Sequence, residues 1–199
     1  MATLNTYALI DLNDVREALG FEPTEGISEN NLFIGLINRT SARIETYCGR
    51  KFKIREYTEY QDGDGSPNVF TDQYPITTVS ELWDDTEVLF TDSTNDQISS
   101  SDFLIYSEEG NIRLYNDETI FSKGRQNIKI IYSGGYTDIP DDLKQAGIDW
   151  AITMYRKLKD QTHGYMTKSA GGASSMIDMQ AIPREVKAIL DSYKKPKVN

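Results

Sequence analysis

The sequence has few of the residues on which catalytic and metal sites most often depend. Among its 199 residues there is one cysteine, Cys48, and one histidine, His163. A lone cysteine excludes a disulfide within the chain and fits folding in a reducing cytoplasm. As a nucleophile, Cys48 would need a histidine partner, and the only histidine lies more than a hundred residues away. We therefore predict that Cys48 packs in the core and that His163 is a surface residue at a helix end.

Other absences narrow the possible classes of protein further. No apolar run approaches the roughly 20 residues that a membrane-spanning helix needs. The first residues lack a basic segment followed by a hydrophobic stretch, so we expect no secretory signal. Walker and dinucleotide-binding loops, zinc-ligand spacings and a serine nucleophile elbow are also missing. The sequence thus predicts a protein without enzymatic activity, without a cofactor and without a membrane partner.

Basic residues are in short supply as well. Lys and Arg number 21 against 31 Asp and Glu, which gives a net charge of −10 and a pI of about 4.6. Free-standing nucleic-acid binders usually have the opposite sign, because much of their affinity comes from neutralising phosphates. An acidic charge does not exclude a protein that lies close to DNA. A ring through which DNA slides works best when it does not bind the phosphates. The hydrophobic fraction of 38% is otherwise ordinary for a globular protein.

Helical patterns occupy both ends of the chain. A short helix is predicted from Leu12 to Leu19, capped by Asp11. A longer helix is predicted from about Glu29 to Cys48, with Ser28 as its cap and apolar residues at three- and four-residue steps. Gly49 is expected to end it in a left-handed conformation.

The middle of the chain changes to short runs of β-branched and aromatic residues separated by turn residues. The candidate strands are 53–60, 68–71, 78–83, 87–90, 102–106, 111–115 and 127–133. The sequence therefore predicts an α+β fold, a small helical bundle of about four helices with an antiparallel β-sheet or small barrel inserted in mid-chain. The predicted helical core covers 1–52 and 134–199, and the β-rich subdomain covers 53–133.

Two more helices are predicted near the C-terminus, one from Pro140 to about Asp160 and one starting at Pro183. Residues 164–181 between them are rich in Gly, Ser and Ala but also carry methionines. A stretch of that length without a structural pattern indicates a mobile or partner-bound segment. Its apolar side chains and those of the last helix suit an adaptable contact. The candidate interface residues are Met166, Met176, Ile177, Met179, Val186, Ile189 and Tyr193.

Acidic clusters are the remaining candidates for chemistry. The segment 62–66 begins like a calcium loop, but the sixth and twelfth places hold Pro67 and Gln73 in place of Gly and Glu. A β-turn explains the segment better, with a loosely held cation as the alternative. The acidic pairs 108–109 and 141–142 resemble glycosidase carboxylates, but a turn and a helix start account for them. We predict no metal site.

Five short blocks stand out by their order and spacing. They are Ile44–Phe52, Tyr57–Tyr60, Pro75–Val79, Ile128–Tyr136 and Ile139–Ala146. Across about residues 8–160 they resemble the head-tail connector, or adaptor, family of tailed phages. The resemblance implies a structural virion protein that forms a ring, commonly a dodecamer, in the neck of the particle.

The same resemblance implies a set of partners. One face of the ring would bind the portal protein and the other a tail, stopper or neck protein, with dsDNA passing through the lumen without specific binding. The C-terminal region often makes the portal contact in this family, which would give that role to residues 164–195. The subunit would fold in the host cytoplasm during assembly.

Other classes stay open. A tail-completion or tail-terminator subunit would also form rings, but on tail tubes. A carbohydrate-binding or carbohydrate-active β module would fit the 12 tyrosines and the acidic pairs, and would present an exposed aromatic platform on the inserted sheet. A hydrolytic enzyme fits least, because no nucleophile has a partnered histidine.

Overall fold

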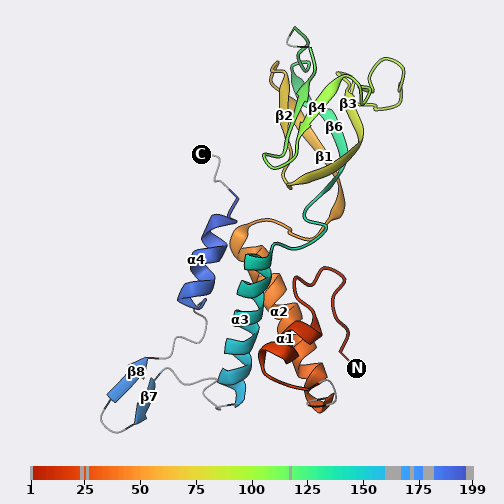
Figure 1. Cartoon of the computed structure of the whole chain (residues 1–199). Helices are drawn as coiled ribbons and strands as arrows, with labels where there is room; N and C mark the ends of the chain where they lie inside the picture. Colours follow the sequence, from red (N-terminus) through yellow and green to blue (C-terminus); the bar gives the residue numbers. More distant parts are fainter. Residues whose placement is uncertain are drawn as a thin grey trace. The chain divides into compact units, whose positions relative to one another are not determined.

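Two structural units alternate along the chain in the order helical, β, helical (Figure 1). The computed structural model describes residues 2–22, 25, 27–116, 118–159, 167–170, 173–176 and 182–195. Unit 1 combines Met1–Arg50 with Ile139–Asn199, and unit 2 is Lys51–Asp138. None of the helices in this described part is long and apolar enough to cross a membrane.

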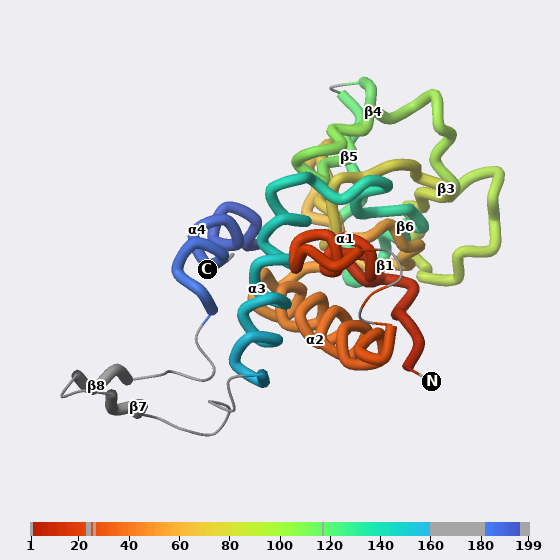
Figure 2. Tube along the Cα trace, turned by 60° about the horizontal axis from the view of Figure 1, so that its bottom comes forward, coloured from red at the N-terminus to blue at the C-terminus, as the bar shows by residue number. Residues whose placement is uncertain are grey.

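Unit 1 is a small helical bundle. Its described helices are α1 (Leu12–Ala18), α2 (Asn30–Cys48), α3 (Asp141–Lys159) and α4 (Arg184–Ser192), and a 3-10 turn, η1 (Ile27–Glu29), precedes α2. In Figures 1 and 2, α3 lies between α4 on one side and α2 on the other. The helices α2 and α4 both run antiparallel to α3 (Figure 1). The predicted α+β class with about four helices is confirmed.

The helix ends follow the predicted capping chemistry in most places. The backbone N–H of Asp11 donates to Oδ2 of Asp14 at 2.8 Å, which fixes the start of α1. Gly49 has a φ of 68° and ends α2 in the left-handed region. The predicted cap of α2 is wrong, because Ser28 lies inside η1 and Glu29 is the N-cap. Glu29 is held there by hydrogen bonds from α3, which local sequence does not reveal.

The apolar stripe predicted for α2 is the inner face of that helix. Phe33, Ile37 and Ile44 are all 0% exposed. The ring of Phe33 lies 5.1 Å from the ring of Tyr155 on α3, within a cluster that also includes Ala151. Burial of such apolar surface, at about 25 cal/mol per Å², is the main term that holds the bundle together.

A buried arginine links α1 to the start of α2. Arg16 is 6% exposed, and its Nη1 donates to Oδ1 of Asn30 at 2.8 Å. Its Nη2 donates to the backbone carbonyls of Glu22 and Glu25. One guanidinium therefore satisfies carbonyls of the connecting segment that would otherwise need water.

The described residues of unit 2 form two antiparallel sheets of three strands each. The strands are β1 (Arg55–Gly63), β2 (Asn68–Phe70), β3 (Ile76–Asp84), β4 (Phe103–Tyr106), β5 (Asn111–Leu114) and β6 (Gly124–Gly134). Their orders are β1-β6-β3 and β2-β5-β4. The inner faces of the two sheets share one apolar core, to which Val69, Leu82, Phe103, Ile112, Leu114, Phe121, Ile128, Ile130 and Tyr132 contribute. The predicted antiparallel sheet or small barrel is thus two small sheets around a common core.

The entry and exit of unit 2 lie side by side. Lys53 and Tyr136 form a parallel β-bridge, and the N–H of Ile54 donates to the carbonyl of Tyr136 at 3.0 Å. The N–H of Tyr136 donates to the carbonyl of Phe52 at 2.6 Å. Because its two ends are tied together, unit 2 can sit within the helical sequence as a closed insertion.

The predicted strand at 87–90 is wrong. The carboxylate of Asp85 accepts the backbone N–H groups of Glu87, Leu89 and Phe90 at 2.8, 2.8 and 2.6 Å. Val88 and Phe90 adopt left-handed φ values of 60° and 51°, which no strand tolerates. The segment is β-rich in composition, but it folds as a loop around one carboxylate.

A second difference lies between α3 and α4. The strands β7 (Thr167–Ala170) and β8 (Ala173–Met176) pair as an antiparallel hairpin inside the stretch for which no pattern was predicted. The Gly-, Ser- and Ala-rich sequence carries no alternation of apolar and polar residues, so it gave no strand signal.

Candidate assembly surfaces

The outer face of the sheet β2-β5-β4 carries large exposed apolar side chains. Leu104 lies opposite Arg113, and Tyr106 lies opposite Asn111, which pairs in turn with Phe70. Opposite residues share a face, so this outer face displays Leu104 (43% exposed), Tyr106 (43%) and Phe70 (60%). Tyr115, just after β5, continues the alternation and is 69% exposed. We call Phe70, Leu104, Tyr106 and Tyr115 the aromatic face.

Carboxylates frame the aromatic face at both ends. Glu108 and Glu109 are exposed in the turn between β4 and β5, next to the pair of Tyr106 with Asn111. Asp102 lies beside Tyr115, whose N–H donates to the Asp102 carbonyl at 2.8 Å. An apolar centre with a charged rim is the usual anatomy of a protein-protein contact.

The other sheet, β1-β6-β3, has an aromatic cluster on its outer face, and the side chain of Lys129 packs against it. Nζ of Lys129 lies 5.3 Å from the ring centre of Trp83 and 5.8 Å from that of Phe90. The ring centre of Tyr60 lies 5.5 Å from that of Phe90, with the rings tilted by 56°, and Nζ of Lys129 is also 3.5 Å from the carboxylate of Glu81. This cluster anchors the loop around Asp85 to the sheet, so its role is structural.

A groove of about 520 Å³ runs along α2 in unit 1. It is lined by Arg39, Ala42, Arg43, Thr46 and Tyr47 of α2, by Trp150 of α3 and by Ile182. We call it the α2 groove. It combines aromatic and aliphatic side chains with two exposed arginines, and no carboxylate is among the described residues that line it.

The helix α4 contains two of the predicted interface residues, Val186 and Ile189, and a third, Tyr193, is its C-cap. Val186 is 1% exposed and packs inside unit 1, and Ile189 is half-buried. The hydroxyl of Tyr193 donates to Oδ1 of Asp142 at 2.6 Å. Met166, Ile177 and Met179 lie outside the described residues, and of Met176 only its place in β8 is described. The interface prediction for these residues stays a prediction.

A cluster of polar groups fixes the end of α4 to the end of α2. The hydroxyl of Tyr47 donates to Oδ1 of Asp191 at 2.6 Å, and Nζ of Lys194 lies 2.8 Å from the same oxygen. Nζ of Lys194 also lies 4.1 Å from the centre of the Tyr47 ring. These contacts lower the pKa of Asp191 and raise that of Lys194, chiefly through their mutual hydrogen bond.

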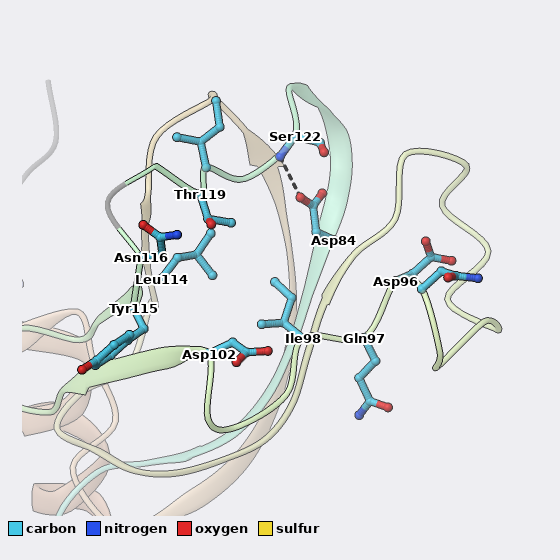
Figure 3. Close-up of a pocket in the computed structure, with 12 residues that line it drawn as sticks. Asp84, Asp96, Gln97, Ile98, Asp102, Leu114, Tyr115, Asn116, Thr119 and Ser122 are labelled. Atoms are coloured by element: carbon cyan, nitrogen blue, oxygen red, sulfur yellow. Dashed lines mark hydrogen bonds between the residues drawn. The ribbon is translucent and has the colours of Figure 1, made fainter.

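Three acidic residues of unit 2, Asp84, Asp96 and Asp102, line a hollow of about 600 Å³, but their carboxylates do not converge (Figure 3). Oδ2 of Asp84 accepts the N–H of Ser122 at 2.7 Å, and Oδ1 accepts Nδ2 of Asn127 at 3.0 Å. The carboxylates of Asp96 and Asp102 point elsewhere in Figure 3. No group of three potential metal ligands is found in the part of the chain that the structure describes. The Asp84 carboxylate has a structural role.

The candidates for chemistry have structural roles where they are described. Cys48 is 2% exposed, and burial raises the pKa of its thiol to about 11, so it stays protonated at neutral pH. His163 lies outside the described residues. In the turn at 62–66, Oδ1 of Asp62 accepts the N–H of Gln126 and Oδ1 of Asp64 accepts the N–H of Ser66, both at 2.8 Å. These carboxylates organise a turn.

The fold and these surfaces define an α+β chain of two units, which carries an exposed apolar sheet face on unit 2 and a groove with two arginines on unit 1. Over residues 8–196 the chain matches the head completion protein family. Because the match spans nearly the whole sequence, the chain belongs to the head completion protein family and is a structural protein, not an enzyme. The predicted kinship with phage head-tail adaptors is confirmed at the level of this family.

Three solved structures have a similar fold. One is a chain in the neck of an empty gene transfer agent (GTA) particle computed with C6 symmetry, with a TM-score of 0.61, 14% identity, and coverage of 99% of this chain and 95% of that chain. A chain in the virion of the native particle has a TM-score of 0.61 and 15% identity, and the match covers 99% of this chain and 95% of that chain. A chain in the neck of the native particle computed with C12 symmetry has a TM-score of 0.60 and 15% identity, and the match covers 100% of this chain and 95% of that chain. No curated protein matches this chain in sequence.

Sequence reasoning missed the aromatic face and the α2 groove. A signal for the first was present, since β4 is apolar at four successive positions whereas a half-buried strand needs only alternate ones. The α2 groove depends on which helices meet, and periodicity does not encode that. The aromatic face is also the kind of platform that the carbohydrate-binding alternative required, but family membership identifies a structural protein.

Proposed function

We propose that the chain is one subunit of a ring in the neck of a phage-like particle, docked between the portal and the tail. The observation that carries this proposal is the match to the head completion protein family over residues 8–196. Support comes from similar chains in the neck of gene transfer agent particles, because the match covers 95% of each of those chains. In this role the subunit folds in the host cytoplasm and then joins the neck.

The proposed ring has twelve copies. One similar chain belongs to a neck computed with C12 symmetry and another to a neck computed with C6 symmetry. Contacts between unlike faces of neighbouring copies close into a ring when the rotation per copy divides the circle. A portal ring would supply the template for that rotation.

DNA passes through the proposed ring without being bound. The net charge of −10 supports this, because a lumen that repels phosphates does not hold back a sliding duplex. The neighbours of the ring would be the portal protein on one face and a tail, stopper or neck protein on the other.

The portal contact is proposed for residues 164–195, which contain the seven predicted interface residues. Within this region α4 supplies Ile189 and its C-cap is Tyr193, while Val186 packs α4 against the rest of unit 1. Deleting 164–181 is expected to abolish binding to the purified portal while the rest of the chain stays folded. Pull-down with the portal measures this, and a deletion variant that binds like the wild type would refute the contact.

Deletion of the gene tests the function itself. Negative-stain electron microscopy of lysates is expected to show DNA-filled heads without a stable neck, and a plasmid copy is expected to restore complete particles. Loss of a tail-completion ring would instead leave heads with necks and unfinished tails. Intact particles after the deletion would contradict both functions.

A further inference from the structure

The charge of the chain is divided unequally between its two units. Unit 2, Lys51–Asp138, contains 17 Asp and Glu against 7 Lys and Arg, whereas unit 1 contains 14 of each sign. The whole net charge of −10 therefore belongs to unit 2. In a ring of identical copies, a contact of one unit 2 with another brings like charges together, and a contact with unit 1 avoids this repulsion.

The aromatic face of unit 2 is complementary to a surface that is both basic and apolar. Its four large apolar side chains are 43–69% exposed, which leaves their hydrophobic area in water. Glu108 and Glu109 are exposed at one end of it and Asp102 at the other. The matching surface must bury the aromatic rings and present cations to the rim.

The α2 groove of unit 1 has those two properties. Tyr47, Trp150 and Ile182 provide apolar walls, and Arg39 and Arg43 stand one helical turn apart on the exposed side of α2. Across the described residues, neither guanidinium forms an ion pair with a carboxylate. Like charges at this spacing slightly destabilise a helix, and carboxylates from a neighbour would reverse that effect.

We infer that the aromatic face of one copy docks in the α2 groove of the next copy, with Glu108 and Glu109 paired to Arg39 and Arg43. This inference rests on the proposed ring. Burial of the aromatic side chains supplies the affinity, and the four charges set the register. The contact joins unlike faces, so its repetition around an axis can close.

Charge reversal in a particle-producing strain that lacks the gene tests this pairing. Arg39→Glu/Arg43→Glu and Glu108→Lys/Glu109→Lys are each expected to lower the yield of complete particles at least about 100-fold, because like charges then face each other. The variant that carries all four substitutions is expected to recover to within about tenfold of the wild type. Arg156→Glu/Glu56→Lys, which reverses exposed charges elsewhere on both units, serves as the matched control and should not change the yield.

The outcomes separate this contact from the proposed function. If the fourfold variant stays as defective as its parents, the pairing is wrong, while a neckless phenotype of the deletion keeps the ring. A defect confined to the arginine variant would assign the α2 groove to another occupant, such as DNA phosphate, and would also overturn the pairing. A defect confined to the glutamate variant would assign the aromatic face to a different neck protein, and this would overturn the pairing too.

Arg39→Gln/Arg43→Gln replaces the charge reversal if thermal melting shows that the Arg39→Glu/Arg43→Glu variant is unfolded. A wild-type yield from the glutamine variant would equally refute the pairing.

Discussion

Asp85, Asn127 and Glu29 are polar side chains that fix the backbone around them. Asp85 organises the loop that follows it, whereas Asn127 and Glu29 join segments that lie far apart in the sequence. Asn127 is 0% exposed, and its Oδ1 accepts the N–H of Gly63 at 2.9 Å while its Nδ2 donates to Oδ1 of Asp84 at 3.0 Å. A Cβ at Gly63 would lie 1.8 Å from the carbonyl oxygen of Ser122, so only glycine fits this crossing. At the scale of single residues, a few satisfied polar groups shape the turns of both units.

Asp85→Ala should loosen the loop between β3 and β4. Without the carboxylate, the N–H groups of Leu89 and Phe90 lose their acceptor, and the left-handed backbone at Val88 loses its support. We expect the melting temperature to fall by about 5 °C and the two amides to exchange faster with solvent. Glu87→Ala, an exposed position in the same loop, is the control, and equal melting temperatures of the two variants would contradict the role of Asp85.

Glu29 should make the stability of unit 1 depend on pH in the acidic range. Its carboxylate accepts hydrogen bonds from Nζ of Lys159 and from the hydroxyl of Tyr155, both at 2.5 Å, and these hold its pKa below the ordinary value of 4.5. A lowered pKa in the folded state gives stability that is fully present above pH 4.5 and is lost as the pH falls through the folded value.

The measurement is urea unfolding of the wild type and Glu29→Gln between pH 3 and pH 7. The advantage of the wild type should be constant above about pH 5.5 and should shrink steadily below about pH 4.5. An advantage that does not change across this range would show that the carboxylate contributes no charge-dependent stability.

At the scale of elements, periodicity predicted the helices and most of the strands because burial repeats along them. The stripe of α2 and the alternation of β5 were visible in the sequence, and Asp11 and Gly49 marked helix ends. The strand predicted at 87–90 was wrong because these residues favour strands, whereas their backbone N–H groups donate to the carboxylate of Asp85 and form a loop. Contacts that form only when the chain folds back on itself, such as those of Arg16 with Glu22 and Asn30, do not appear as a repeating pattern in the sequence.

Gly49 and Gly35 form a matched pair for testing the end of α2. A Cβ at either position would meet no atom within 4 Å, but only Gly49 has a left-handed φ, of 68°. Gly49→Ala should therefore destabilise the chain by about 1 kcal/mol through backbone strain. Gly35→Ala, inside the helix, should stabilise it by up to about 1 kcal/mol. Chemical denaturation measures both, and the same sign for the two substitutions would contradict the assigned helix end.

At the scale of the whole molecule, a helical unit with its own core carries an inserted β unit with another. The net charge of the chain is known from its composition. That this charge is concentrated in Lys51–Asp138 becomes clear only when the boundaries of the two units are known. Of the candidate assembly surfaces, the sequence indicated the C-terminal region alone. The aromatic face and the α2 groove depend on strand register and helix packing, which a single sequence does not specify.

The two cores should lose stability independently of each other. Ile112 of unit 2 and Phe33 of unit 1 are both 0% exposed. We propose that Ile112→Ala and Phe33→Ala each cost about 2–5 kcal/mol, chiefly in their own unit. Hydrogen exchange of the full-length chain should show faster opening of 51–138 in the first variant and of the helices in the second. Uniform acceleration of both units in either variant would mean that they unfold as one.

The ring is tested most directly by cryo-electron microscopy of complete particles that contain this chain. The expected map shows a closed ring of its copies directly below the portal, with DNA in the lumen and the aromatic face of each copy against the α2 groove of the next. A neck from which the chain is absent, or a chain found only along the tail tube, would contradict the proposed role.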